Sequence, residues 1–207
     1  ILHSLCIHPV KSLHGLSVTD IQLCPWGPEN DRIWMVTDRE RNFLTQRKHP
    51  AMATLNVSVM TDGLRLSRHG MTDLVVKRPR NQTHSVTVWN DTVQAVDAGE
   101  EAAGWMSEAL GLPCRLVYMP SPQSDRPRSW NGRDFANSFS DGFPLLVTTL
   151  ASLDDLNRRL TQPVPMDRFR PNLVISGADA WEEDRWARIR IGEVELSLVK
   201  ACSRCVM

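Results

Sequence analysis

Cys202 and Cys205 lie beside the cations Lys200 and Arg204 near the end of the chain. A Cys-x-x-Cys pair can be half of a zinc site, a thioredoxin-like redox pair, two unrelated buried thiols, or the source of one thiolate that binds a soft transition metal. Zinc needs two more ligands, and the sequence has no second cysteine pair and no histidine pair at ligand spacing. A redox pair normally opens a helix in a βαβ unit, which the sequence does not show. The spacing leaves unrelated thiols and a soft-metal ligand open, and the neighbouring cations favour the thiolate form.

Three of the cations outside the predicted helices lie at strand ends or turns: Lys11 in a turn after a strand, Arg32 at the start of a strand, and Arg170 directly before a proline. Each alone is typical of a solvated surface residue, but binding sites are commonly built on loops and strand ends. Arginine binds phosphate through two parallel hydrogen bonds, and lysine acts as a point charge. The set predicts a site for a small, rigid, phosphate-bearing ligand. Three neutral residues could add hydrogen bonds to it: Ser12, Asn172 and Ser203.

Asp141 directly precedes an apolar run at residues 143–149 that predicts a strand. A loop aspartate in this position is typical of an Asx-turn, in which the carboxylate accepts a hydrogen bond from nearby backbone. A carboxylate that is desolvated beside a site can instead relay protons. The sequence leaves both roles open.

The composition excludes several classes of protein. Lys and Arg together number 24, as do Asp and Glu, so no global charge favours nucleic acid or an anionic membrane surface. Aromatic residues are not interleaved with basic ones, so a stacking platform for single-stranded nucleic acid is unsupported. No window approaches the ~18–20 consecutive apolar residues that a membrane-spanning helix needs. The five scattered cysteines argue against a secreted disulfide framework and favour a reducing, cytoplasmic compartment.

The pattern along the chain predicts many short strands and about two short helices, which indicates a mainly β protein built from β-barrels. Alternating runs joined by short turns predict hairpins around residues 61–63, 90–91 and 192–193. The stretch 120–137 is rich in Pro, Ser, Arg, Asp and Asn and lacks periodicity. We therefore predict two domains, residues 1–119 and 120–207.

Several local expectations follow from single residues. A helix is expected over residues 99–111, because a continuous apolar stripe precedes Gly111, a good C-terminal stop. Gly15 is expected to adopt a positive φ in a turn, and residues 43–47 are expected to form a strand. Ser152 is expected to cap a short helix that turns three leucines inward. These are Leu153, Leu156 and Leu160.

Six short motifs occur in this order along the chain: Ile7-His8-Pro9-Val10-Lys11-Ser12, Asp31-Arg32-Ile33-Trp34, Phe43-Leu44-Thr45-Gln46-Arg47, Ser140-Asp141-Gly142-Phe143-Pro144, Phe169-Arg170-Pro171-Asn172-Leu173-Val174-Ile175-Ser176-Gly177 and Ala201-Cys202-Ser203-Arg204-Cys205. Together they resemble the MOSC-domain molybdoproteins that carry an N-terminal MOSC β-barrel domain. That group includes amidoxime-reducing components and bacterial relatives that detoxify hydroxylated bases. The resemblance covers essentially the whole chain, and six ordered motifs are far more specific than any one of them.

The resemblance implies a molybdenum cofactor (molybdopterin) and the reduction of small N-hydroxylated substrates, amidoximes and hydroxylated bases, with release of water. By resemblance, Cys205 is the thiolate ligand of molybdenum and Cys202 is its neighbour. Asp141 matches an acidic residue near the metal and is the candidate for proton handling. Six residues match positions that hold the phosphate and pterin of the cofactor: Lys11, Ser12, Arg32, Arg170, Asn172 and Ser203.

The resemblance also implies an electron-donor protein, which could be a flavoprotein reductase, a ferredoxin-like protein or a cytochrome-type protein. Family members continue past the last motif, so we expect a MOSC domain that is incomplete at its C-terminus, with open barrel edges. Association with the mitochondrial membrane would follow if an anchor had been removed; otherwise a cytoplasmic location is expected. One alternative function is a cofactor carrier or sulfur-transfer module without reductase turnover. Another is a metal-free interaction domain with incidental thiols.

Overall fold

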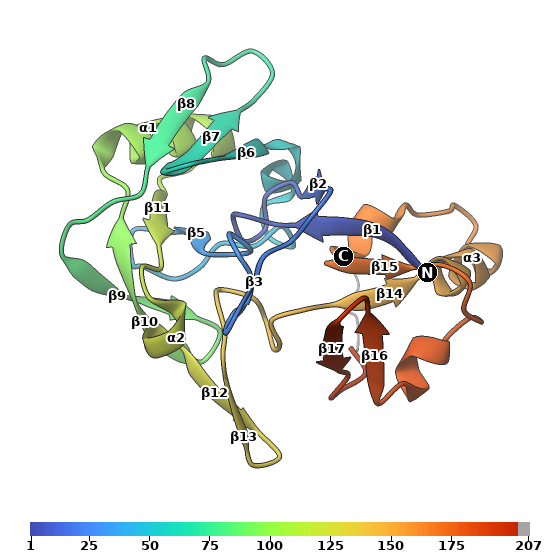
Figure 1. Ribbon diagram of the computed structural model, residues 1–207. Coiled ribbons are helices and arrows are strands. Elements are labelled where there is room, and N and C mark those ends of the chain that lie inside the picture. The colour runs from blue at the N-terminus through green and yellow to red at the C-terminus, as the bar shows by residue number, and fades with distance from the viewer. Residues whose placement is uncertain (203–207) are drawn as a thin grey trace. The chain divides into compact units, whose positions relative to one another are not determined.

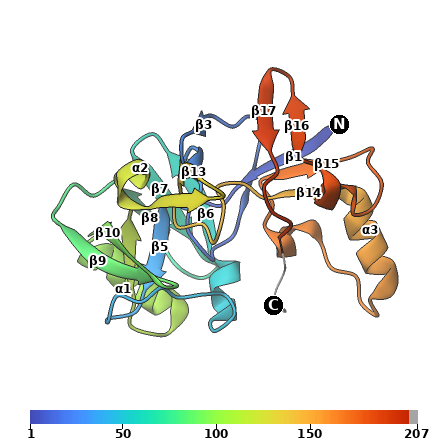
Figure 2. The same ribbon diagram turned by 90° about the horizontal axis from the view of Figure 1, so that it is seen from below.

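The computed structural model describes residues 1–202 and is mainly β (Figures 1 and 2), which confirms the predicted fold class. In chain order its strands are β1 (Leu2–Ile7), β2 (Leu16–Val18), β3 (Leu23–Cys24), β4 (Gly27–Pro28), β5 (Trp34–Thr37), β6 (Asn56–Met60), β7 (Gly63–Ser67), β8 (Leu74–Lys77), β9 (Thr83–Val88), β10 (Asp91–Asp97), β11 (Arg115–Tyr118), β12 (Pro127–Trp130), β13 (Arg133–Ala136), β14 (Val147–Thr149), β15 (Leu173–Ile175), β16 (Arg188–Ile191) and β17 (Val194–Ser197). The α-helices are α1 (Glu100–Leu110), α2 (Pro122–Asp125) and α3 (Leu150–Arg159). The 3-10 helices are η1 (Pro50–Thr54), η2 (Met166–Phe169) and η3 (Glu182–Arg185).

The strands form several small open sheets. Two sheets have four strands, in the orders β14-β15-β1-β2 and β5-β11-β10-β9, and a third has the order β6-β7-β8. Three two-stranded sheets pair β12 with β13, β16 with β17, and β3 with β4. Within residues 1–202 no sheet closes into a barrel. The pairing of β14 with β15 is parallel, whereas β15 runs antiparallel to β1.

The chain divides into two compact units. The larger unit contains Ile7–Leu16 and Gln22–Pro144, and the smaller unit contains Ile1–Cys6, Ser17–Ile21 and Leu145–Met207. In the smaller unit β1 lies beside β15 (Figures 1 and 2), so the start of the chain pairs with a strand from its last third. The division into domains 1–119 and 120–207 stays a prediction.

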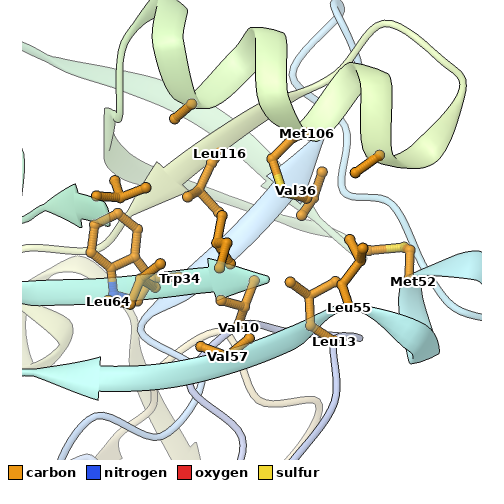
Figure 3. Close-up of a cluster of buried hydrophobic side chains, with 14 of the residues drawn as sticks. Val10, Leu13, Trp34, Val36, Met52, Leu55, Val57, Leu64, Met106 and Leu116 are labelled. Atoms are coloured by element: carbon orange, nitrogen blue, oxygen red, sulfur yellow. The ribbon is translucent and has the colours of Figure 1, made fainter. Parts of the chain in front are cut away.

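The main apolar core of the larger unit lies between α1 and the strands (Figure 3). Met106 of α1 points toward Leu116 and Val36, and the fully buried ring of Trp34 lies near Leu64. Helix α1 covers the predicted range, buries its apolar stripe and ends at Gly111, whose φ of 69° lies in the left-handed region. The predicted helix is therefore confirmed.

A second apolar cluster is built by the alternate residues of the same strands. In β5, Val36 belongs to the main core and Met35 to the second cluster, and in β11 Leu116 and Val117 divide in the same way. Successive side chains of a strand point to opposite faces, so the β5-β11-β10-β9 sheet buries apolar residues on both faces. Phe139, which is fully buried, belongs to this second cluster and immediately precedes the loop that carries the candidate site.

The predicted hairpins are present, with one small shift. Thr61 and Asp62 connect β6 and β7, and Gly192 and Glu193 connect β16 and β17, with a φ of 59° at Gly192. The turn between β9 and β10 lies one residue earlier than expected, because Val88 pairs with Asp91. The stretch 120–137, which lacks periodicity in the sequence, contains α2, β12 and β13. Strand β8 has no counterpart among the sequence predictions.

Two predictions from the first fifty residues are wrong. Residues 43–47 do not form a strand: Phe43 makes only an isolated bridge to Thr37, and the chain then turns. Gly15 does not have a positive φ; Ser12, with a φ of 69°, takes the left-handed conformation in this turn instead. Gly15 is required for a different reason, because a Cβ atom there would lie 2.5 Å from the Nδ1 atom of His8.

Helix α3 also differs from its prediction. Thr149 is the N-cap, and its hydroxyl accepts a hydrogen bond from the backbone N–H of Ser152 at 3.1 Å. Ser152 therefore lies within the first turn rather than before it. Leu160 follows the helix with an extended backbone and is 39% exposed, so it does not point inward as predicted.

Candidate functional site

Lys11 and Asp141 form an ion pair within the larger unit. The backbone of Lys11 is fixed first, because its N–H donates to the carbonyl of Trp34 at 2.8 Å. Its side chain is only 7% exposed, and Nζ donates to the carbonyl oxygen of Phe139 at 2.8 Å and to the carboxylate of Asp141. The fold thus brings together two predicted site residues that are 130 positions apart in the sequence.

The two members of this pair respond differently to their surroundings. Burial lowers the pKa of the Lys11 ammonium to about 8, although the Asp141 carboxylate acts in the opposite direction. At Asp141 desolvation raises the pKa, but the charge and hydrogen bond of Lys11, the indole N–H of Trp89 at 2.9 Å and the charge of Arg32 outweigh it and hold the pKa at about 2. The Asp141 side chain is 64% exposed, so water also screens the pair. Both groups are charged at neutral pH.

Arg32 links the segment before β5 to the loop that carries Asp141. Its Nη1 donates to Asp31 Oδ2 at 2.6 Å, and the buried Asp31 accepts a second hydrogen bond from the backbone N–H of His8 at 2.7 Å. The backbone of Arg32 donates to the carbonyl of His8 and accepts from the N–H of Phe139, both at 2.8 Å. The predicted site residue Arg32 is therefore held by its backbone as well as its side chain.

Arg126 is a buried cation that the sequence prediction missed. It is 2% exposed, donates to the carbonyl oxygen of Ser138 at 2.7 Å and also donates to that of Ser140. Its Nη2 and Nε donate to Asp91 at 2.7 and 3.0 Å. Burial lowers the pKa of Arg126, and Asp91 opposes that effect. Arg126 therefore holds the carbonyls of Ser138 and Ser140, and Lys11 holds the carbonyl of Phe139 between them.

Three of the predicted cofactor contacts have a left-handed backbone. The φ angles are 69° at Ser12, 51° at Arg32 and 54° at Arg170. Side chains other than those of Gly, Asn and Asp rarely adopt this conformation, and such strained residues concentrate at functional sites. Arg170 adopts it as the residue that ends η2, one position before a proline.

Asn172 and Arg170 belong to the smaller unit. Asn172 is fully buried, and its side chain accepts from the N–H of Leu146 at 3.2 Å and donates to the carbonyl of Cys6 at 3.1 Å. Its backbone carbonyl accepts from the N–H of Cys6 at 2.9 Å. These bonds join the segments before β14 and β15 to β1, so Asn172 has a structural role. Its contact with a cofactor stays a prediction.

The remaining predicted residues are at the end of the chain. Ser203 and Cys205 lie outside the described residues, whereas Cys202 is described and exposed. Within residues 1–202 no group of three His, Cys, Asp or Glu side chains is arranged to hold a metal ion. That Cys205 is the metal ligand stays a prediction.

The charged groups of the larger unit fit an anionic cofactor. Among the described residues of this region four cations and three carboxylates form ion pairs, and several of these groups are shielded from water. Positive charge next to loop backbone is the environment that a phosphate group favours. The cations are Lys11, Arg32, Arg126 and Arg128, and the carboxylates are those of Asp31, Asp91 and Asp141.

Comparison with known proteins gives two family matches. The model of the MOSC N-terminal beta barrel domain matches residues 1–113, and the model of the MOSC domain matches residues 134–207. Among curated proteins, mitochondrial amidoxime-reducing component 1 of Mus musculus is 37% identical over 98% of this chain and 63% of its own length. The Homo sapiens component 1 is 37% identical over 98% of this chain and 64% of its own length, and the Homo sapiens component 2 is 33% identical over the same shares. The chain spans just under two thirds of the length of these relatives.

Proposed function

Because the chain belongs to the family of proteins that combine a MOSC N-terminal β-barrel domain with a MOSC domain, we propose that it is a molybdenum-cofactor-dependent reductase of N-hydroxylated compounds. The observation that carries this proposal is the similarity to amidoxime-reducing components, which extends over 98% of the chain. The left-handed backbone at Ser12, Arg32 and Arg170 supports it, because strain at three predicted cofactor contacts is a mark of a functional site.

The proposed reaction converts an N–OH group into an N–H group and water, and it consumes two electrons and two protons. A bound molybdenum cofactor would supply the redox chemistry. A partner protein of the flavoprotein-reductase, ferredoxin-like or cytochrome type would supply the electrons. The chain itself would hold the cofactor through Cys205 at the metal and through the phosphate and pterin contacts predicted above.

We propose a proton-handling role for each partner of the Lys11–Asp141 ion pair. Asp141, with a pKa of about 2, is ionised at neutral pH, so its exposed carboxylate would accept a hydrogen bond from a substrate N–H or O–H group. Lys11, with a pKa of about 8, holds its proton close to the pH at which it can be released. We therefore expect the transferable proton to lie on Lys11 Nζ, and the Asp141 carboxylate to hold the substrate group that receives it.

The compartment also remains part of the proposal. Within residues 1–202 the structure has no helix of the length and apolar character needed to cross a bilayer. The names of the relatives place those proteins in mitochondria. For this chain we propose a reducing compartment, either the cytoplasm or a mitochondrial membrane surface reached through an anchor.

The test measures molybdenum and pterin content, and amidoxime reduction with an artificial electron donor, in protein from a host that makes the cofactor. Stoichiometric molybdenum with turnover supports the proposal, and Cys205→Ser should lose the metal–thiolate signature. Bound cofactor without turnover would instead favour a carrier or sulfur-transfer module. A cofactor-proficient host that yields protein with neither molybdenum nor pterin would contradict both functions.

Arg170→Ala tests the predicted phosphate contact in the same preparation. A charge-assisted hydrogen bond of this kind contributes roughly 1.5–3 kcal/mol, so the variant should retain about 10–100-fold less cofactor. Arg185→Ala is the matched control, because Arg185 is an exposed arginine of the same unit and lies outside the predicted site. Equal cofactor retention in the two variants would remove Arg170 from the site.

A further inference from the structure

Trp89 occupies a turn position that normally takes glycine. Val88 pairs with Asp91 across the β9–β10 hairpin, so Trp89 and Asn90 form the two-residue turn. Trp89 has a φ of 56°, and Asn90 is not among the residues with positive φ. A positive φ at the first turn residue only is the pattern of a type II′ turn, in which that position favours glycine. The β16–β17 hairpin follows this rule with Gly192, at a φ of 59°.

The strained residue holds its indole against the candidate site. The indole Nε1–H of Trp89 donates to Asp141 Oδ1 at 2.9 Å. The ring packs against Phe43 with centroids 4.8 Å apart and an interplanar angle of 57°. Trp89 is nevertheless 41% exposed, and the Asp141 side chain is 64% exposed. An aromatic surface and a carboxylate therefore lie next to each other, and both are accessible to a ligand.

Arg47 shows which kind of group can stack on the indole ring of Trp89. Its guanidinium carbon lies over the Trp89 ring, 5.1 Å from the ring centroid. A guanidinium is a planar N–C–N group, and an amidoxime or amidine has the same planar arrangement. Arg47 is exposed and has no hydrogen bond or ion pair with any of residues 1–202, so its side chain can leave the ring at little cost.

We propose that the Trp89 ring, supported by Phe43, forms a stacking platform that binds planar N-hydroxylated substrates beside Asp141, and that Arg47 covers this platform until a substrate displaces it. The choice of substrate class rests on the proposed function. The platform favours conjugated, ring-bearing compounds over small aliphatic ones, because stacking energy grows with the area of the flat group. A role in binding would account for a bulky residue at a turn position that disfavours it.

The first test uses binding and needs neither metal nor turnover. The indole N–H resonance of Trp89 is identified by its absence from the spectrum of Trp89→Phe. Titration with benzamidoxime should shift this resonance, and acetamidoxime at the same concentration should shift it much less. Arg47→Ala should tighten benzamidoxime binding by ~2–5-fold, because the competing cation is removed. Equal shifts with the two compounds, or none with either, would overturn the platform.

The second test separates binding from stability and turnover. Trp89→Ala should raise the KM or Kd for benzamidoxime by ~2–10-fold and change that for acetamidoxime by less than about twofold. Trp89→Gly should lose the same selectivity while its melting temperature stays within about 3 °C of wild type, because glycine relieves the turn strain. A large fall in melting temperature with unchanged selectivity would make Trp89 purely structural.

The results of these tests also show whether the platform proposal or the reductase proposal has failed. If the Trp89 resonance responds selectively but no amidoxime is reduced, the reductase proposal fails and the binding platform stands. If amidoximes are reduced but Trp89→Ala affects benzamidoxime and acetamidoxime equally, the reductase stands and the platform is wrong.

Discussion

Charged side chains are buried in the larger unit, whereas the buried polar residues in the described part of the smaller unit are all neutral. Lys11, Asp31 and Arg126 of the larger unit are 6%, 2% and 2% exposed. The buried polar residues of the smaller unit are Thr149, Ser152 and Asn172. The two units therefore differ in the kind of polar group that their interiors tolerate.

The larger unit also has more buried apolar residues than the described part of the smaller unit. Both apolar clusters belong to the larger unit, whereas the buried apolar residues in the described part of the smaller unit are confined to Pro171 and to Leu173, Val174 and Ile175 of β15. Burial of an ionised group is unfavourable unless it is paired and hydrogen-bonded, and extensive apolar burial elsewhere can offset that cost. The comparison indicates that the larger unit has the stability to fix charges rigidly at the candidate site. The predicted site residues of the smaller unit are supported by fewer buried apolar side chains.

Arg126→Ala should have the largest effect on the larger unit. The substitution leaves Asp91 without its buried partner and removes the donor to the carbonyls of Ser138 and Ser140. Loss of one partner of a buried pair typically costs about 3–5 kcal/mol, which urea unfolding would measure. Arg133→Ala, an exposed arginine of β13, is the control and should change stability by less than about 0.5 kcal/mol. A loss below about 1 kcal/mol for Arg126→Ala would mean that Arg128 alone satisfies Asp91.

A matched pair of valines tests the difference in packing directly. Val36 of the larger unit is 0% exposed and Val174 of the smaller unit is 2% exposed, so the same truncation removes the same buried atoms. Val36→Ala should cost about 2–3 kcal/mol because a dense core leaves a cavity, and Val174→Ala about 1 kcal/mol. Urea unfolding combined with hydrogen exchange of amides in each unit would measure both. Equal costs would show that the smaller unit packs as tightly as the larger one.

The pH dependence of stability should report on the buried lysine. The pKa of Lys11 is lowered from 10.5 to about 8 on folding, so between these values the unfolded chain binds more protons than the folded chain. Stability therefore rises with pH across this window, and Lys11→Met should remove a slope of at most about 1.4 kcal/mol per pH unit. Lys77→Met, an exposed lysine of β8, is the control and should keep the wild-type slope.

Asp141 affects the pH dependence of stability at acidic rather than alkaline pH. Its pKa is lowered from 3.8 to about 2, so its contribution to stability is present above pH 3.8 and is lost as the pH falls toward 2. Asp141→Asn should remove this acid-dependent loss. Unfolding free energies measured from pH 2 to 5 check the sign, and an unchanged profile in Asp141→Asn would show that the ion pair does not form in solution.

Local patterns in the sequence predicted the local elements of the fold. The apolar stripe that ends at Gly111 predicted α1, and short turns between alternating runs predicted the hairpins β6–β7 and β16–β17. The parallel pairing of β14 with β15 and the antiparallel pairing of β15 with β1 join distant segments, so no local pattern carries them. Gly15 shows the same limit, because its role depends on the approach of His8 rather than on its own φ.

Residue types and motifs in the sequence predict which residues belong to the candidate site, but they do not predict which side chains contact each other. Separate sequence features point to Lys11 and to Asp141, and only the fold shows that the two side chains pair. Arg126 was missed because its surroundings, rich in Pro, Ser and Arg, resemble a linker, although the structure buries it against backbone carbonyls. Trp89 gave no signal, since its importance depends on a strained φ and on a carboxylate far away in the sequence.

Leu160→Ala should have the smallest effect and tests the light packing of the smaller unit. Leu160 is 39% exposed, so its truncation should cost less than about 0.5 kcal/mol in urea unfolding. Leu156→Ala, at a half-buried position within α3, should cost about 1 kcal/mol and serves as the comparison. A loss above about 1.5 kcal/mol for Leu160→Ala would restore the inward stripe of three leucines that the sequence predicts. The smaller unit would then have a fuller core, and the contrast with the larger unit would narrow to the charges alone.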